Sequence, residues 1–141
     1  MRPPKPLIRL LGRLHGAVYR ASGGRLLGRV GPARVLLLTT TGRRSGTPRT
    51  VPLLFIHDGD RFVIVASQGG HGTHPAWYVN LRANPYATVQ VGVRVVPVHA
   101  RDADPAEVER LWPALVAVYP AWEGYRARTS RRIPVVLLDP R

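Results

Sequence analysis

The sequence predicts a mainly β domain with flanking helices, built as an antiparallel barrel or sheet of about six strands. Short β-branched runs recur along most of the chain, glycine-containing turns join several of these runs directly, and few helical patterns lie between them. At 141 residues the chain has the ordinary size of one domain with a continuous core. Neither a GxGxxG nor a Walker sequence occurs, which argues against a doubly wound parallel fold.

The first segment, residues 1–34, differs in kind from the rest of the chain. It carries eight basic side chains and no acidic one. Apolar residues recur at three- and four-residue steps from Leu7 to Val18, which predicts an amphipathic helix of about four turns. Such a helix either packs on the domain core or lies on anionic lipid headgroups. We therefore divide the chain into a basic N-terminal helix and linker, residues 1–34, and a barrel domain, residues 35–141.

Six apolar, β-branched runs predict the strands of the second segment. The sequence Asp58-Gly59-Asp60 predicts a tight hairpin between the second and third runs, because Asp and Gly tolerate the positive φ of such turns. A second hairpin is expected around Gly92. The strands are expected at residues 35–41, 51–57, 61–66, 86–91, 93–101 and 133–138.

Helix signals occupy three places in the same segment. Pro75 suits the first turn of a helix over residues 75–82, which Asn84-Pro85 ends. Asp104 and Glu107 provide a cap and a first-turn acid for a helix over residues 104–119. A short helical piece over residues 122–128 precedes the last strand.

Charge and cysteine content narrow the classes of function. The formal net charge is +13, and of the 21 basic residues all but Lys5 are arginine, whose planar fork binds phosphate and carboxylate. An anionic partner is expected, the alternative being a basic surface without a ligand.

The chain has no cysteine, which excludes disulfides, thiolate zinc sites and cysteine nucleophiles, so redox chemistry would need a bound cofactor. With no apolar run long enough to cross a bilayer and no leader pattern, we expect a protein that is neither exported nor membrane-spanning.

The polar segment 39–49, between the first two expected strands, has the composition of an anion cradle. Its glycines allow backbone N–H groups to converge on an oxyanion, and its arginines and serine supply further donors. The alternative is a solvated hairpin loop. The candidate anion ligands are Gly42, Arg43, Arg44, Ser45, Gly46 and Arg49.

A glycine-rich loop feeds the first expected helix of the barrel domain, over residues 66–81. A loop with few side chains lets backbone approach a flat ring, and Trp77 could stack on a conjugated system. Alternatively, Trp77 and Leu81 bury one helix face. His71 and His74 indicate a metal pair only weakly, because thiolates are absent and carboxylates are scarce nearby, and we expect no metal site.

Three aromatic residues recur at three-residue steps near the end of the chain. Tyr119, Trp122 and Tyr125 therefore share one side of a helical turn. Such a stripe is either part of the core or one wall of a pocket, where its phenols and indole find polar partners.

At these three places together the sequence resembles the deazaflavin-dependent nitroreductase family of actinobacteria, a branch of the split β-barrel, flavin-reductase-like superfamily that uses coenzyme F420. The resemblance covers about residues 35–140. Its motifs stand in the family's order: TTTGRRSGTPRTVPL from Thr39, VASQGG from Val65, HPAWYVNLRANP from His74 and YPAWEGYRARTSRRIPVVLLDP from Tyr119.

The resemblance implies a split β-barrel and a set of contacts for the coenzyme. The loop 42–46 would hold its phosphodiester, chiefly through Arg43, Arg44 and Ser45, and residues 49–52 would lead along the ring system. Tyr119, Trp122 and Tyr125 would cover the side of the acceptor. Further implied coenzyme contacts are Val51, Pro52, Val65, Ala66, Ser67, Gln68, Gly69, Gly70, Ala76, Trp77 and Asn80.

The implied activity is hydride transfer from reduced F420 to a quinone or a nitroaromatic acceptor, with Tyr119, Tyr125 or Ser67 hydrogen-bonding the acceptor and relaying a proton. A lipid quinone would explain a basic amphipathic helix by placing the protein at the inner face of the cell membrane; otherwise a cytoplasmic location is expected. One alternative is an FMN- or haem-using relative on the same barrel. The other is a non-catalytic basic module for lipid or nucleic acid, although no row of aromatic-bearing strands indicates a nucleic-acid partner.

Overall fold

The structure is a computed structural model that describes residues 29–30, 33–67, 73–128 and 132–141. The expected N-terminal helix falls on residues outside these ranges. Within the described part, strands dominate and the helices come in the second half of the chain. The elements are β1 (Arg29–Val30), β2 (Ala33–Thr41), β3 (Pro48–Asp58), β4 (Arg61–Val65), α2 (Ala76–Ala83), β5 (Tyr86–Val91), β6 (Arg94–Asp102), α3 (Pro105–Val118), α4 (Ala121–Arg128) and β7 (Val135–Pro140).

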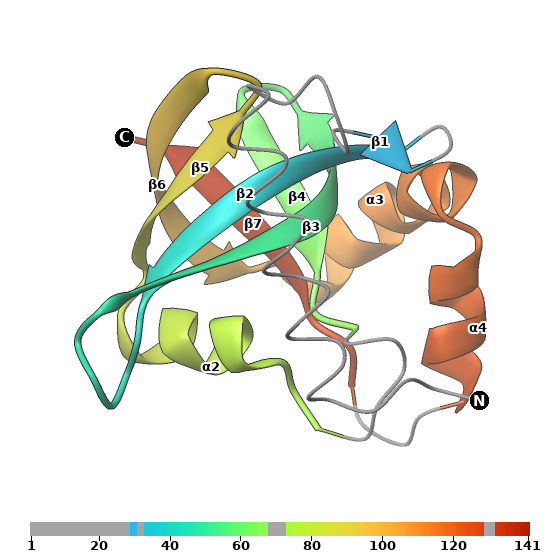
Figure 1. Cartoon of the computed structure of the whole chain (residues 1–141). Helices are drawn as coiled ribbons and strands as arrows, with labels where there is room; N and C mark the ends of the chain where they lie inside the picture. The colour runs from blue at the N-terminus through green and yellow to red at the C-terminus, as the bar shows by residue number, and fades with distance from the viewer. Residues whose placement is uncertain (1–28, 31–32, 68–72, 129–131) are drawn as a thin grey trace.

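The strands close into an antiparallel barrel (Figure 1). The sheet runs β2-β3-β4-β7-β6-β5, and β5 pairs back onto β2 to complete the ring. Leu38 of β2 shows the closure, since it pairs with Val51 of β3 on one edge and with Val89 of β5 on the other. The short strand β1, which the sequence did not indicate, adds to the start of β2. The expected antiparallel barrel of about six strands is confirmed.

Both expected tight hairpins are present. Asp58 pairs with Arg61 around Gly59, whose φ is +62°, and Val91 pairs with Arg94 around Gly92, whose φ is +61°. Strand β3 begins at Pro48, three residues before the expected start at Val51. Pro48 can open the strand because the first position of a strand tolerates a missing N–H, and the pairing of Thr41 with Pro48 leaves only a short turn between β2 and β3.

The core has two layers. One cluster fills the barrel, with Leu36 and Leu38 of β2 packed against Val89, Val98 and inward-facing residues of other strands. A second cluster lies outside the barrel, where α3 and α4 cover β4 and β7. Strands β4 and β7 are buried on both faces, and they accordingly read as continuous apolar runs instead of alternating ones.

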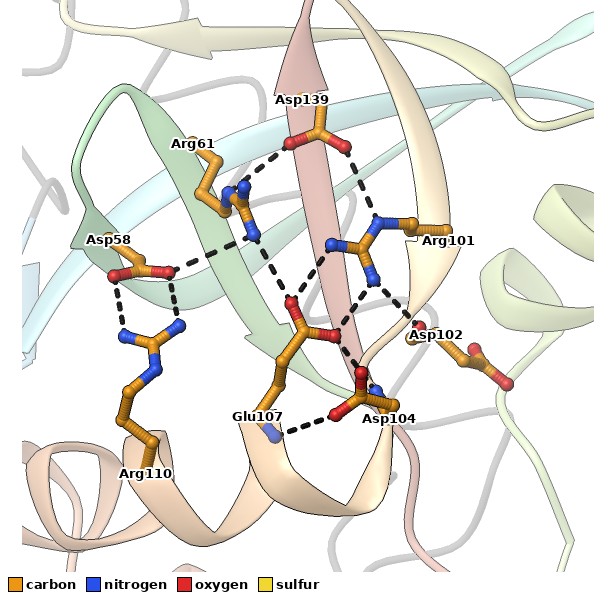
Figure 2. Close-up of polar contacts among 8 residues, drawn as sticks. All are labelled: Asp58, Arg61, Arg101, Asp102, Asp104, Glu107, Arg110 and Asp139. Atoms are coloured by element: carbon orange, nitrogen blue, oxygen red, sulfur yellow. Dashed lines mark hydrogen bonds and ion pairs between the residues drawn. The ribbon is translucent and has the colours of Figure 1, made fainter.

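Helix α3 is fixed to the barrel by a capping box and an ion-pair network (Figure 2). Asp104 accepts a hydrogen bond from the Glu107 backbone N–H at 2.8 Å, and Glu107 accepts one from the Asp104 N–H at 3.0 Å. The Arg101 guanidinium donates twice to Glu107, at 2.8 and 2.9 Å. These bonds lower the pKa of Glu107 from 4.5 to about 2, with the Arg101 hydrogen bond as the larger cause. The network comprises Asp58, Arg61, Arg101, Glu107, Arg110 and Asp139.

Candidate functional site

The cradle loop and helix α2 enclose a cavity of about 360 Å³. Figure 1 shows α2 on the same side of the barrel as the β2–β3 turn. Two segments that 25 residues separate in the sequence thus form one site, and seven of the predicted site residues line it. The lining residues are Gly42, Arg43, Arg44, Ser45, Arg49, Thr50, Ala76 and Asn80.

The two glycines shape the loop. The Gly42 N–H donates to the Thr47 carbonyl and the Gly46 N–H donates to the Gly42 carbonyl, each at 2.8 Å. Gly46 has φ +71°, a left-handed conformation that side chains disfavour. Gly42 is required for space, since a Cβ there would lie 2.6 Å from Ser45 Oγ and 3.2 Å from the Thr47 carbonyl oxygen. The glycines therefore close the turn through their own N–H groups.

Two consecutive backbone donors are left for an anion. The N–H of Arg43 donates to Asn80, and the N–H of Thr47 donates to Ser45 Oγ. In the described part of the chain, no group accepts a hydrogen bond from the N–H of Arg44 or of Ser45. Successive free N–H groups in a turn form a concavity that suits an oxyanion. Within the described residues, the N–H groups of Arg44 and Ser45 are therefore the backbone donors of this loop that an anion could use.

The Ser45 side chain organises the far side of the loop. Its Oγ lies 2.7 Å from Thr47 Oγ1 and accepts from the Arg49 guanidinium at 3.4 Å. Arg49 is therefore held over the turn from the first residues of β3, where the strand pairing places it opposite Thr40.

Asn80 ties helix α2 to the loop from inside. Only 4% of this residue is exposed. Its Oδ1 accepts from the Arg43 backbone N–H at 3.2 Å and from the Arg43 guanidinium at 2.9 Å, and its Nδ2 donates to Thr40 Oγ1 at 3.2 Å. The amide side chain therefore holds the end of β2, the loop and the helix together.

The cavity is strongly cationic. Arg43, Arg44 and Arg49 all line it, and among the described residues no carboxylate pairs with any of them. The eight acidic residues of the chain lie at positions 58–60 and 102–139. Uncompensated guanidinium groups beside free N–H donors fit a phosphate-bearing ligand.

The remaining predicted coenzyme contacts lie elsewhere around this end of the molecule. Val65 and Ala66 are buried in the two core clusters, Ser67 is 9% exposed, and Trp77 is 7% exposed inside the barrel cluster. Trp77 and Leu81 both belong to that cluster, as the packing alternative expects. Gly46, Val51 and Pro52 adjoin the lining residues in sequence, whereas Gln68, Gly69 and Gly70 lie outside the described residues.

Thr50 is the lining residue that the sequence-based set omitted. Its Oγ1 lies 2.8 Å from Thr39 Oγ1 across the β2–β3 pair. Its position between the predicted contacts Arg49 and Val51 is the signal that could have identified it.

The three predicted aromatic residues meet, but away from the cradle. The Tyr119 ring lies 5.2 Å from that of Trp122 and 6.3 Å from that of Tyr125. The two phenol oxygens are 3.3 Å apart, and this hydrogen bond, followed by burial, raises the pKa of Tyr119 to about 12. Trp122 is 4% exposed and packs in the cluster under α3 and α4. Figure 1 places α4 across α2 from the β2–β3 turn, and none of these aromatics lines the 360 Å³ cavity.

A second cavity of about 310 Å³ lies against another face of α2, between that helix, β6 and Val136. On its wall the Tyr78 hydroxyl donates to Asp102 at 2.8 Å and accepts from Arg82 at 3.3 Å. None of the predicted site residues lines it. Within the described ranges no group of three or more His, Cys, Asp or Glu side chains could hold a metal, and no helix is long and apolar enough to span a membrane.

Comparison with known proteins places these features in one family. A family model described as F420H(2)-dependent quinone reductase matches residues 11–140. An F420H(2)-dependent quinone reductase of Mycobacterium tuberculosis is 43% identical over 134 residues, covering 92% of this chain and 89% of that protein. Both findings agree with the resemblance seen in the motifs.

Two solved structures extend the agreement to the fold. An F420-H2 dependent reductase, FDR-A, is 40% identical and has a TM-score of 0.69, with 74% of this chain and 93% of that chain covered. A structure described as a domain-swapped dimer is 34% identical and has a TM-score of 0.72, with 97% of this chain and all of that chain covered. The predicted split β-barrel is confirmed by this similarity.

Proposed function

The chain belongs to the family of F420H(2)-dependent quinone reductases, and from this premise we propose that the loop 42–49 and helix α2 bind coenzyme F420 for hydride transfer to a quinone. The enzyme is an oxidoreductase of that family. The observation that carries the assignment of the site is a 360 Å³ cavity lined by three arginines that no described carboxylate neutralises.

The residues present fit the anionic part of the coenzyme. A phosphodiester offers oxygens to the free N–H groups of Arg44 and Ser45, while Arg43 and Arg49 supply guanidinium donors from two sides of the loop. The glycyl turn fixes these groups before the ligand arrives, so little ordering has to accompany binding. Ala76, the first residue of α2, has a small side chain that leaves the cavity open toward the helix.

When bound in its reduced form, F420 supplies the hydride. The task of the protein is to hold donor and acceptor in contact, exclude water and deliver a proton to the reduced acceptor. Val51 and Pro52 of β3, together with Val65, Ala66, Ser67 and Trp77, are proposed to surround the ring system, as are Gln68, Gly69 and Gly70 from outside the described residues. The alternative of FMN as the bound flavin is tested by titrating the protein with both cofactors.

Tyr119, Tyr125 or Ser67 is proposed as the group that hydrogen-bonds the acceptor and relays the proton. The phenol pair supports the hydrogen bond to the acceptor, because a hydroxyl with a pKa of about 12 stays protonated at neutral pH and remains a donor. Trp122, beneath the pair, is proposed to shape the acceptor side. The acceptor class is a quinone, and nitroaromatic compounds stay a further prediction.

The direct test combines binding and turnover. The purified protein is titrated with F420 and with FMN, and oxidation of F420H2 by menadione is then followed through the absorbance of the oxidised coenzyme. Tight F420 binding with menadione-dependent turnover supports the proposal. Preference for FMN, or F420 binding without turnover on any quinone, contradicts it.

The proton relay is tested at each tyrosine separately. A positioned general acid contributes on the order of 10² to 10⁴ in rate, so Tyr→Phe at the donor should lower turnover by about that factor and leave F420 affinity unchanged. Tyr78→Phe, which removes a phenol bonded to Asp102 in the second cavity, is the matched control. Turnover near the wild-type rate in Tyr119→Phe, Tyr125→Phe and Ser67→Ala would remove these three residues from the proton relay.

We further propose that the basic segment 1–34 attaches the barrel domain 35–141 to an anionic membrane surface, where a lipid quinone would be met. Its support is the sequence pattern: eight basic side chains, no acidic one and an apolar stripe from Leu7 to Val18. Deleting residues 1–28 should abolish pelleting with anionic vesicles, and high salt should weaken pelleting of the whole chain. Equal pelleting of the truncated protein would contradict the attachment.

A further inference from the structure

We propose that Asn80 is a positioning residue whose neutral amide orients Arg43 for anion binding without cancelling its positive charge. The inference rests on the proposed function of the 360 Å³ cavity and deepens it. It changes the role of Asn80 from a contact of the deazaflavin ring to a residue that acts through Arg43.

The hydrogen-bond capacity of Asn80 supports this role. An amide oxygen has two lone pairs, and in Asn80 one receives the Arg43 backbone N–H and the other the Arg43 guanidinium. One amide N–H is used by Thr40 Oγ1. The side chain thus has no acceptor left for a ligand and keeps only one amide N–H outside these bonds.

The same contacts define the conformation of Arg43. Anchoring both its backbone N–H and its guanidinium to one buried oxygen orients the side chain on the cavity wall. It also turns the Arg43 N–H inward, and the next two N–H groups, those of Arg44 and Ser45, are then the pair that no group among the described residues accepts from. Asn80 therefore determines which donors the loop offers.

The choice of amide over carboxylate follows from electrostatics. An aspartate at this position could keep all three hydrogen bonds, because a carboxylate accepts from Arg43 and the Thr40 hydroxyl can rotate to donate. Beside Arg43 it would remain ionised. It would then pair with the guanidinium and offset the positive charge that faces the ligand, as carboxylates do for the arginines of the α3 network. The geometry permits either residue, whereas anion binding favours asparagine.

Substitutions of Asn80 distinguish a positioning role from a packing role. A residue that only held α2 against β2 would tolerate Asn80→Asp, since the size and the bonds are preserved. A residue that serves the charge of Arg43 would not. Asn84, at the end of the same helix, provides a matched control because its Oδ1 accepts from the Tyr86 N–H at 3.1 Å and it has no part in the cavity.

The experiment compares Asn80→Asp, Asn80→Leu and Asn84→Asp with the wild type. Two ligands are titrated: F420, and inorganic pyrophosphate followed through the amide NMR signals of Arg44 and Ser45. Thermal unfolding of each variant is measured in parallel. The deazaflavin core without the phosphodiester and glutamyl tail serves as the uncharged ligand.

We expect Asn80→Asp to unfold near the wild-type temperature and to bind F420 and pyrophosphate about 10- to 100-fold more weakly, with little change for the uncharged core. Asn80→Leu should lose both stability and anion affinity, and Asn84→Asp should change neither. Wild-type affinity of Asn80→Asp for both anions would overturn the proposal. If the wild type bound pyrophosphate in an Asn80-dependent manner but not F420, the proposed coenzyme would be wrong and the positioning role would stand.

Discussion

Arginine performs two different tasks at the two sides of this barrel. Arg43, Arg44 and Arg49 line the cavity, and no carboxylate within the described residues pairs with them. Under α3, by contrast, Arg61 contacts Asp58, Glu107 and Asp139, and the other arginines of that network also face carboxylates (Figure 2). The comparison shows that the partner of an arginine decides its role. An arginine paired with carboxylates stabilises the fold, and an arginine without one is available to bind an anion.

The energetic consequences of the two arrangements are opposite. Paired guanidinium groups satisfy carboxylates and cross-link elements, so they contribute to the stability of the fold. The guanidinium groups of Arg43, Arg44 and Arg49 face no carboxylate in the described part of the chain and repel one another, so their charges stabilise the protein mainly when an anion is bound. Substitutions at the cradle should therefore change binding with little loss of stability, and substitutions in the network should do the reverse.

The largest effect is expected for replacing Arg43 and Arg44 together by Ala. F420 affinity should fall by about 2 to 4 kcal/mol, since charge-assisted hydrogen bonds contribute about 1.5 to 3 kcal/mol each and are not additive. Isothermal titration and thermal unfolding measure the two effects; the fold should survive, and the unfolding temperature should fall only slightly, through the lost Arg43–Asn80 hydrogen bond. Arg94→Ala at the β5–β6 turn is the control for a removed surface charge. Unchanged affinity in the double variant would contradict the binding role of the cradle arginines.

Arg61→Ala should produce the opposite pattern. Removing the central cation leaves Glu107 and Asp139 with one guanidinium fewer, and we expect a loss of about 1 to 2 kcal/mol in the free energy of unfolding, as for several partly exposed pairs. Urea unfolding measures the loss. F420 affinity should equal that of the wild type, and a parallel loss of affinity would show that the two regions are not separate.

The backbone offers a sharper version of the same comparison. Gly46 and Gly59 both adopt positive φ, +71° and +62°, with no atom close enough to obstruct an added Cβ. Changing either to Ala should cost about 1 kcal/mol of stability through the left-handed conformation. Only Gly46→Ala should also weaken F420 binding, because only that turn presents the Arg44 and Ser45 donors. Equal F420 affinities in the two variants would argue that the loop conformation is unimportant.

The smallest effect is expected in the free energy of unfolding at low pH. The Arg101 hydrogen bond lowers the pKa of Glu107 from 4.5 to about 2, so the stabilisation by ionised Glu107 is complete above about pH 4.5 and is lost as the pH falls toward about 2. The unfolding free energies of the wild type and Glu107→Gln should differ at pH 6 and converge over that window. Glu109→Gln, an exposed position on the same helix, should show no such convergence. A constant difference between wild type and Glu107→Gln down to pH 2 would contradict the pairing.

Most of the barrel could be predicted from local patterns. Apolar, β-branched runs and glycine turns located the strands, because strand propensity and positive φ are properties of a few adjacent residues. Pro48, Arg49 and Thr50 did not read as strand, since they are polar or proline; they extend β3 because Thr40 and Thr41 pair with them. Strand β1 was not predicted because it is only two residues long, which is too short to give a pattern.

The candidate site could also be predicted only in part from the sequence. Arginines, glycines and serine in one short loop predicted an anion cradle from composition alone. The composition of the loop could not reveal that Asn80 accepts a hydrogen bond from the Arg43 N–H, or that Trp77 is buried inside the barrel. Those facts depend on how α2 packs across the strands, which local spacing does not encode.

By itself, the sequence determined where most strands lie along the chain, the composition of the cradle and the family that its motifs resemble, because each is carried by residues close together in the chain. Only the tertiary structure decided that β5 closes onto β2, that α2 completes the cavity and that every carboxylate lies away from the cradle arginines. The physical reason is that pairing, burial and charge compensation are relations between distant segments. In this protein, the guanidinium groups available to an anion are those that the fold places away from the carboxylates.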